Sequence, residues 1–347
     1  MEIKSTPPRF AWGIGRWQFW LGLVFSLLFL WLALREVNFP QLAQTLRAVN
    51  GWLLAAALLN SLLSILARGL RWQRLLAARK TPAFGRTFSA LAVGLMANTF
   101  FPARLGDFAR AYILGETESD SKAYLLGSIA LEKLADLLFL LFSLLILLSQ
   151  LTFPGWLAAP AQASAVGIFL LLPLFLLLLW QKNVFLRLME SLSRWLFPRW
   201  QAAFLRQTRL LLDSLDVIRQ PRALLNFLLW SLLVWAVSVF TNSLVFWAMG
   251  LSLPWWSAIF ILAVLQAGIV VPSSPGRVGV FQYLLVLALS VLAVEKNAAL
   301  GYSLVLYLVV YLPVILLGVY YLWREQAAWQ KMSLALNLFR RAGNPPQ

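Results

Sequence analysis

The sequence predicts an all-α membrane protein, a polytopic helix bundle with six to eight spans and two re-entrant or broken helices. Of its 347 residues, 61% are hydrophobic and only 12% are charged, whereas a water-soluble domain usually carries about 25% charged residues. The interval from residue 137 to 181 has no ionisable side chain, and is long enough to cross a hydrocarbon layer of about 30 Å twice. Its apolar runs do not alternate with polar residues, so the spans are expected to be helices rather than barrel strands.

An internal repeat divides the chain into two halves. A Pro-x-Arg-x-Gly-x-Phe pattern occurs at residues 102–108 and returns 173 positions later at residues 275–281. Interruptions by Pro and Gly at matching places in two halves point to the binding site of a transporter built from inverted repeats. We expect one transmembrane domain over residues 1–347, with halves of about 1–173 and 174–347.

Each predicted span is an apolar window close to the length that a bilayer requires. The full spans are placed at about residues 17–34, 52–67, 125–148, 164–180, 224–250 and 298–323. Two shorter windows, 88–101 and 257–271, each run directly into one copy of the repeated pattern. These two windows would either enter the membrane and turn back or cross it as tilted spans, and the sequence leaves both alternatives open.

Loop charges predict the orientation of the spans. The loop from Arg68 to Arg86 is basic and has no acid, while the connection from 150 to 163 has no charge at all. Lys and Arg accumulate on the cytoplasmic side, so the first loop, both termini and the tail at 324–347 are expected in the cytoplasm, with the protein in the plasma membrane. The short windows would then dip in from opposite faces.

The segment from 183 to 218 is a predicted cytoplasmic connector. Its apolar residues recur at helical spacing with arginines between them, and Pro198 interrupts the pattern. This is typical of two amphipathic helices lying on a leaflet that carries anionic lipid. A solvated connector that only maintains topology is the alternative.

Composition also limits the partners and the chemistry. The net charge is +16, but the basic residues cluster beside the spans, so anionic membrane lipids are expected as partners and nucleic acid is not. The chain has no His and no Cys, which removes most zinc and haem ligation. We expect no cofactor, no metal and no catalytic residue, and the oligomeric state is left open.

Three charges lie where a membrane span should have none. Glu132, Lys133 and Asp136 fall about 12–18 Å into the span that begins near Tyr124, at about 1.5 Å per residue. Burying them costs about 9 kcal/mol, at about 3 kcal/mol each. Cations from elsewhere must therefore meet the two acids, and Arg104 and Arg110 are the first candidates.

The arginines of the repeated pattern suit an anionic ligand. A guanidinium group binds phosphate or carboxylate through two parallel hydrogen bonds and stays charged, so Arg104, Arg110 and Arg277 are expected to hold a lipid phosphate. The acids would balance these arginines, or carry a coupling proton. A buried ion-pair network that only stabilises the fold is the structural alternative.

The candidate residues for substrate binding and translocation come from both copies of the pattern and from the charged span. They are Asn98, Pro102, Arg104, Gly106, Asp107, Arg110, Glu132, Lys133, Asp136, Pro275, Gly276, Arg277, Gly279 and Gln282. Arg68 and Arg71 lie at the end of a predicted span. There they are expected to extend to the interface, or to give the substrate access to the site.

Four ordered motifs carry a family resemblance. They are Arg68-x-x-Arg71-Trp72, Asn98-x-x-x-Pro102-x-Arg104-x-Gly106-Asp107-x-x-Arg110, Glu132-Lys133-x-x-Asp136 and Pro272-x-x-Pro275-Gly276-x-x-Gly279-x-Phe281. Together they resemble the lysylphosphatidylglycerol synthase transmembrane-region family, over roughly residues 17–323. The resemblance implies a flippase-like membrane protein that moves lipid between leaflets.

The chain departs from the family's pattern at three positions. Asp107 stands where the family usually has Glu, Lys133 where it has Arg, and Gln282 where an acid is often found. If relatives carry a proton at that last position, coupling here would fall to Glu132 or Asp107.

Three functions therefore remain in competition. The first is a translocase for a phosphate-bearing lipid or lipid-linked headgroup. The second is a membrane enzyme, either an aminoacyl-lipid synthase or a polyprenyl-linked glycosyltransferase, and the third is an assembly or regulatory subunit that transports nothing.

Overall fold

The computed structural model describes residues 16–35, 37–101, 104–150, 166, 170, 181–196, 201–268 and 275–324. This part of the chain is all-helical and contains no strand. In chain order its elements are α1 (Arg16–Leu34), α2 (Phe39–Arg47), α3 (Gly51–Leu76), α4 (Phe84–Phe100), α5 (Leu105–Glu118), α6 (Lys122–Gln150), α8 (Lys182–Leu196), α9 (Gln201–Asp213), η3 (Ser214–Arg219), α10 (Pro221–Ala248), α11 (Trp256–Ala267), η5 (Pro275–Arg277), α12 (Val280–Val291) and α13 (Lys296–Arg324).

Three of these helices are long and apolar enough to cross a membrane by length and composition. Among the described residues these are α3, α10 and α13, which contain or closely match the predicted spans 52–67, 224–250 and 298–323. The predicted spans 17–34 and 125–148 are helical as α1 and α6. The predicted span 164–180 lies outside the described residues, apart from residues 166 and 170.

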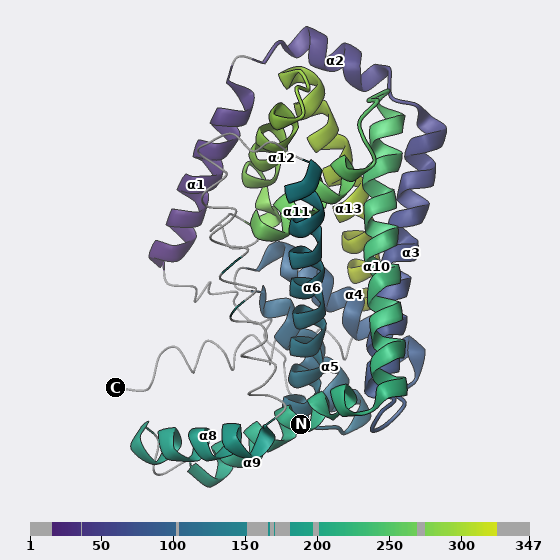
Figure 1. Cartoon of the computed structure of the whole chain (residues 1–347). Coiled ribbons are helices and arrows are strands. Elements are labelled where there is room, and N and C mark those ends of the chain that lie inside the picture. The colour runs from purple at the N-terminus through teal and green to yellow at the C-terminus, as the bar shows by residue number, and fades with distance from the viewer. Residues whose placement is uncertain are drawn as a thin grey trace, which may run out of the picture.

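The long helices α3 and α10 run side by side (Figure 1). Buried polar side chains join them. The Asn60 amide donates to the carbonyl of Val237 at 2.8 Å and to Thr241 Oγ1 at 2.9 Å. Hydrogen bonds of this kind connect helices whose other contacts are apolar on both sides. The apolar core continues toward α13, where Tyr302 donates to Asn242 Oδ1 at 3.0 Å.

Each copy of the repeated pattern lies at the turn of a helical hairpin. In the first hairpin α4 and α5 pack so closely that a Cβ added to Gly106 would lie 1.9 Å from the carbonyl oxygen of Gly94. In the second, Gly268 of the α11 end packs against Leu284 of α12. The first hairpin lies in the lower half of the bundle in Figure 1 and the second in the upper half.

The connector forms two helices, as its periodicity predicts. Helices α8 and α9 pack on each other and lie across the lower end of the bundle in Figure 1. The end of α9 is held against α6 because Gly127 has no side chain: a Cβ there would lie 2.3 Å from the Leu211 carbonyl oxygen. The interruption at Pro198 and the tail beyond Arg324 lie outside the described residues.

Candidate functional site

The three charges of α6 meet charges from two other helices inside the bundle. Glu132 is 1% exposed, and Arg71 of α3 and Arg110 of α5 are 2% and 3% exposed. Asp107, one turn before Arg110 on α5, is 8% exposed. Together these groups form a closed ring of alternating sign, which we call the charge ring. Its members in order are Arg71, Glu132, Arg110, Asp107, Lys133 and Asp136, which returns to Arg71.

The two arginines form the tighter part of the charge ring. Arg71 Nε lies 3.2 Å from Glu132 Oε1, and Arg71 Nη1 lies 3.3 Å from Asp136 Oδ1. Arg110 Nη2 lies 2.8 Å from Glu132 Oε2 and 3.2 Å from Asp107 Oδ1. Glu132 therefore bridges two guanidinium groups from different helices, which offsets the cost of burying its charge.

Lys133 closes the charge ring on its more accessible side. Its Nζ lies 3.8 Å from Asp107 Oδ2 and 3.9 Å from Asp136 Oδ2, and the side chain is 34% exposed. These two contacts are the longest in the ring. The charge ring is therefore most loosely closed at Lys133.

Neutral side chains support the charge ring from outside. The Arg110 guanidinium carbon lies 4.8 Å from the ring centroid of Trp72, and Trp72 Nε1 donates to Ser128 Oγ at 3.0 Å. Asn98 Nδ2 donates to Asp107 Oδ1 at 3.2 Å. Asn98 Oδ1 and Arg110 Nε are buried without a hydrogen-bond partner among the described residues. The site therefore has one hydrogen-bond acceptor and one donor that a ligand could engage.

Further cations surround the charge ring. With three groups of each sign the ring itself is neutral, but Arg68 faces the charges of Asp136 and Glu132, and Arg104 faces that of Asp107. Arg277 in turn acts on Arg104. Within the part of the chain that the structure describes, none of Arg68, Arg104 and Arg277 forms an ion pair within 4.0 Å. The site as a whole therefore carries excess positive charge.

Arg104 and Arg277 occupy matching positions of the repeated pattern. Each has a left-handed conformation, with φ of 55° at Arg104 and 56° at Arg277, which is uncommon for residues other than Gly, Asn and Asp. Arg104 immediately precedes α5, and Arg277 follows Gly276, whose φ is 79°. The repeated pattern therefore places one arginine at the turn of each hairpin, as the sequence predicts.

The second turn is held by neutral groups. The Tyr307 hydroxyl donates to the carbonyl of Gly276 at 2.7 Å, and Gln282 Oε1 accepts from the backbone N–H of Gly279 at 2.7 Å. Gly279 has φ of 90°. Arg277 interacts with the side chain of Tyr311. Gln282, predicted to bind substrate, is 3% exposed and has this capping contact.

The structure brings together most of the predicted residues but changes their pairing. Arg110 meets Glu132 as expected, whereas Arg104 and Arg277 form no ion pair with either predicted acid. The expectation that Arg71 extends to the interface is wrong, since its side chain is buried in the charge ring. Pro102 lies outside the described residues, and of Pro275 only the backbone is described.

A signal for the role of Arg71 was present in the sequence. The predicted span ended at residue 67 because Arg68 and Arg71 lower the local hydropathy, but the helix continues to Leu76. Trp72 and Leu75 extend its apolar face and are buried. An arginine inside a continuing apolar face indicates a buried ion pair rather than a membrane boundary.

A separate ion-pair cluster joins the end of α5 to the loop before α4 and to the first turn of α4. Glu118 Oε2 lies 3.2 Å from Lys80 Nζ, and its Oε1 lies 3.1 Å from Arg86 Nη1. Desolvation disfavours the charged carboxylate, but hydrogen bonds from these two cations outweigh it and lower the pKa of Glu118 below its usual 4.5. In the described part of the chain, no group of three or more His, Cys, Asp or Glu could hold a metal ion.

Comparison with known proteins identifies the family. Neither the curated proteins nor the solved structures contain a match to this chain. The profile described as Lysylphosphatidylglycerol synthase TM region matches residues 19–318, which include the four helices of the two hairpins and the helices α3 and α6 that contribute to the charge ring. The chain therefore belongs to the lysylphosphatidylglycerol synthase transmembrane-region family and is a membrane protein.

Proposed function

We propose that the chain is a lipid translocase, which moves a phosphate-bearing lipid or lipid-linked headgroup between the leaflets of the plasma membrane. The observation that carries the proposal is the excess of cations around a charge ring that is already neutral. Arg104 and Arg277 come from the two hairpin turns, and the charge of Arg277 acts on Arg104. An anion between them would offset this repulsion.

The chemistry of the two arginines favours phosphate as that anion. An unpaired charge inside a membrane is expensive, by about 3 kcal/mol or more for each group. A lipid phosphate offers oxygens to both guanidinium groups, and guanidinium binds phosphate through paired hydrogen bonds. The lipid tails would remain in the hydrocarbon layer while the headgroup passes through the polar interior of the bundle.

The proposed arrangement in the membrane follows from the two hairpins. We propose that α4–α5 and α11–α12 are re-entrant hairpins of an inverted repeat, which enter from opposite faces and meet near the charge ring. Six further crossings would complete the bundle, with both termini in the cytoplasm. Their positions in opposite halves of Figure 1 support this arrangement, and site-directed labelling of residues 80 and 250 from each side of the membrane tests it.

The function is tested with purified protein in vesicles that contain a headgroup-labelled phospholipid. Arg104→Asn and Arg277→Asn remove the charges while keeping a residue that tolerates positive φ. We expect each variant to slow headgroup crossing at least tenfold. The thermal midpoint should stay close to that of the wild type, because neither arginine has an ion-pair partner among the described residues and Arg277→Asn removes only the contact with Tyr311. Arg104→Lys should retain part of the activity.

The control is Arg194→Gln on α8, whose side chain is 65% exposed and pairs with Glu190 at the surface. With this variant the lipid headgroup should cross at the wild-type rate. Wild-type crossing by both folded Asn variants would refute the proposal. Recovery of a chemically altered lipid from the vesicles would favour the membrane enzyme, and no crossing by the wild-type protein would favour the assembly subunit.

A further inference from the structure

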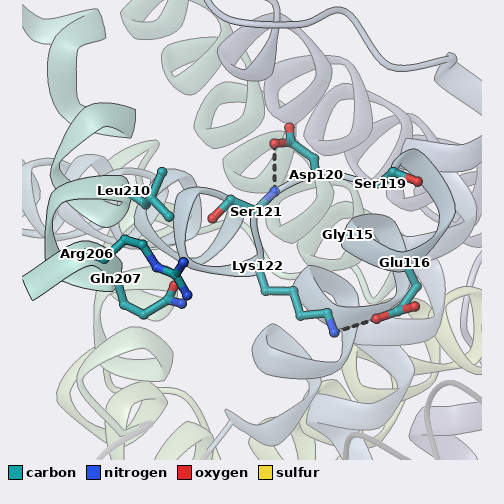
Figure 2. Close-up of a pocket in the computed structure, with 9 residues that line it drawn as sticks. All are labelled: Gly115, Glu116, Ser119, Asp120, Ser121, Lys122, Arg206, Gln207 and Leu210. Carbon is teal, nitrogen blue, oxygen red and sulfur yellow. Dashed lines mark hydrogen bonds and ion pairs between the residues drawn. The ribbon is translucent and has the colours of Figure 1, made fainter. Parts of the chain in front are cut away.

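A surface groove lies where the connector meets the first hairpin. It encloses about 470 Å³ between the end of α5, the turn at residues 119–121, the start of α6 and one face of α9 (Figure 2). Its lining residues are Gly115, Glu116, Ser119, Asp120, Ser121, Lys122, Arg206, Gln207 and Leu210. From Lys122 to Glu132 is ten residues along α6, or about 15 Å, so the groove is separate from the charge ring.

The acids of the groove are already engaged. Lys122 Nζ lies 2.5 Å from Glu116 Oε1 and 3.8 Å from the ring centroid of Tyr112. Asp120 Oδ1 accepts from the backbone N–H of Ser121 at 2.7 Å and lies 3.7 Å from Arg79 Nη1. Neither carboxylate is therefore available to neutralise another cation without losing a contact it has.

Arg206 is a charged residue of the groove that is available to bind an anion. It is exposed on α9 and forms no ion pair within the described part of the chain. In Figure 2 the side chains of Arg206 and Gln207 extend from α9 toward Ser121 and Lys122. A guanidinium, an amide and a serine hydroxyl on facing walls provide the donors that a phosphate group needs.

The position of the groove favours a lipid as the source of that phosphate. Helices α8 and α9 lie across the end of the bundle (Figure 1), with Leu188, Leu192 and Phe204 exposed at 54%, 43% and 36%. Exposed apolar residues beside arginines are typical of helices that lie in a membrane interface. Leu210 continues this apolar surface into the groove.

We propose that this groove is a second phosphate site, which holds the phosphate ester of an anionic phospholipid headgroup at the membrane surface. Arg206 and Gln207 bind the phosphate oxygens from α9, and Ser121 and Lys122 bind them from α6 and its preceding turn. Helices α5 and α6 both run from this groove to the charge ring. This proposal does not depend on the proposed translocation, because it requires only that the groove binds the phosphate.

The absence of cysteine from the chain allows a direct binding test. The variant Phe204→Cys introduces a single cysteine into the full-length protein, and a fluorophore is attached to it. Binding of short-chain phosphatidylglycerol that carries a quencher on its headgroup is then measured in detergent as quenching of the fluorescence. Arg206→Glu should weaken this binding at least tenfold. Arg209→Glu makes the same charge change on the same helix but outside the groove, and should change binding less than twofold.

Competition distinguishes the two sources of phosphate. Displacement by unlabelled short-chain phosphatidylglycerol but not by glycerol 3-phosphate supports a lipid site, and displacement by both supports a site for which the phosphate ester suffices. Equal weakening by Arg206→Glu and Arg209→Glu would overturn the proposal, since general attraction to α9 would then explain binding. Arg104→Asn should leave binding at the groove intact. A loss of groove binding and a loss of lipid translocation can therefore be observed separately.

Discussion

The two hairpin turns share the left-handed conformation of their arginine and differ in their charge. Arg104 and Arg277 have nearly the same φ, 55° and 56°, and each is followed two residues later by a glycine in very close contact. A Cβ on Gly106 would lie 1.9 Å from the Gly94 carbonyl oxygen, and one on Gly279 would lie 2.1 Å from the Ser26 carbonyl oxygen. The repeat therefore preserves the left-handed arginine and the close glycine contact, although Gly106 lies within α5 whereas Gly279 precedes α12.

The chemistry around the turns is not repeated. The first turn leads into Asp107 and Arg110, which belong to the charge ring, whereas the equivalent positions after the second turn are Val280 and Tyr283. Gln282 holds the second turn with a neutral hydrogen bond. The second turn is therefore held by neutral hydrogen bonds, whereas the first turn leads into buried charges.

The largest loss of stability should come from breaking the charge ring beside the first hairpin turn. Arg110→Gln leaves Glu132 and Asp107 short of a cation, which should lower the free energy of unfolding by about 3–5 kcal/mol. Tyr283→Phe, at the equivalent position of the second side, should change it by less than about 1 kcal/mol. Chemical unfolding in detergent micelles measures both.

A double variant keeps this prediction specific to the ion pair. Adding Glu132→Gln to Arg110→Gln removes one of the stranded acids and should recover part of the lost stability. An Arg110→Gln variant as stable as Tyr283→Phe would show that the two sides do not differ as described.

The next effect tests what the two turns have in common. The added Cβ of Gly279→Ala would clash with the Ser26 carbonyl oxygen, and alanine would also be strained at a φ of 90°. The added Cβ of Gly106→Ala would clash with the Gly94 carbonyl oxygen. Each should cost about 1–3 kcal/mol, with Gly279→Ala the more costly because strain adds to the clash. Gly85→Ala on α4, where nothing lies within 4 Å, is the matched control and should not destabilise. Thermal midpoints that fall equally for all three would argue against close packing at the turns.

The smallest effect concerns the neutral cap of the second turn. Gln282→Met keeps the approximate size of the side chain but leaves the Gly279 N–H without its acceptor, which should cost about 1–2 kcal/mol. Ser290→Ala, an exposed position on the same helix, should change stability by less than about 0.5 kcal/mol. If Gln282 only holds the turn, lipid crossing by Gln282→Met will equal that of the wild type once both are folded.

Local sequence signals predicted the helical fold and the turns of the hairpins. Apolar runs located α3, α10 and α13, and the repeated pattern located Arg104 and Arg277. Helix α2 was missed, although Asn38 caps it by accepting from the Gln41 N–H at 3.2 Å and Pro40 lies in its first turn. Its cap and proline were a readable start signal, but the helix is too short to appear among apolar windows.

The pairing of the charges could not be read from local patterns. Arg71 and Glu132 are 61 residues apart, and only the packing of α3 against α6 shows that they meet. The groove beside α9 is likewise a product of packing, because Gly127 allows α9 to approach the charged helix. Sequence patterns show which groups need partners, while the fold decides which partners they find.

The closed form of the charge ring restricts how these positions can change. Each member contacts two groups of opposite sign, so replacing one alone leaves two of its neighbours short of a partner. Exchanges that keep the charge ring neutral must replace one basic and one acidic residue together. Redesign of this region will therefore succeed through compensating double changes, and a library of single substitutions will find few tolerated ones.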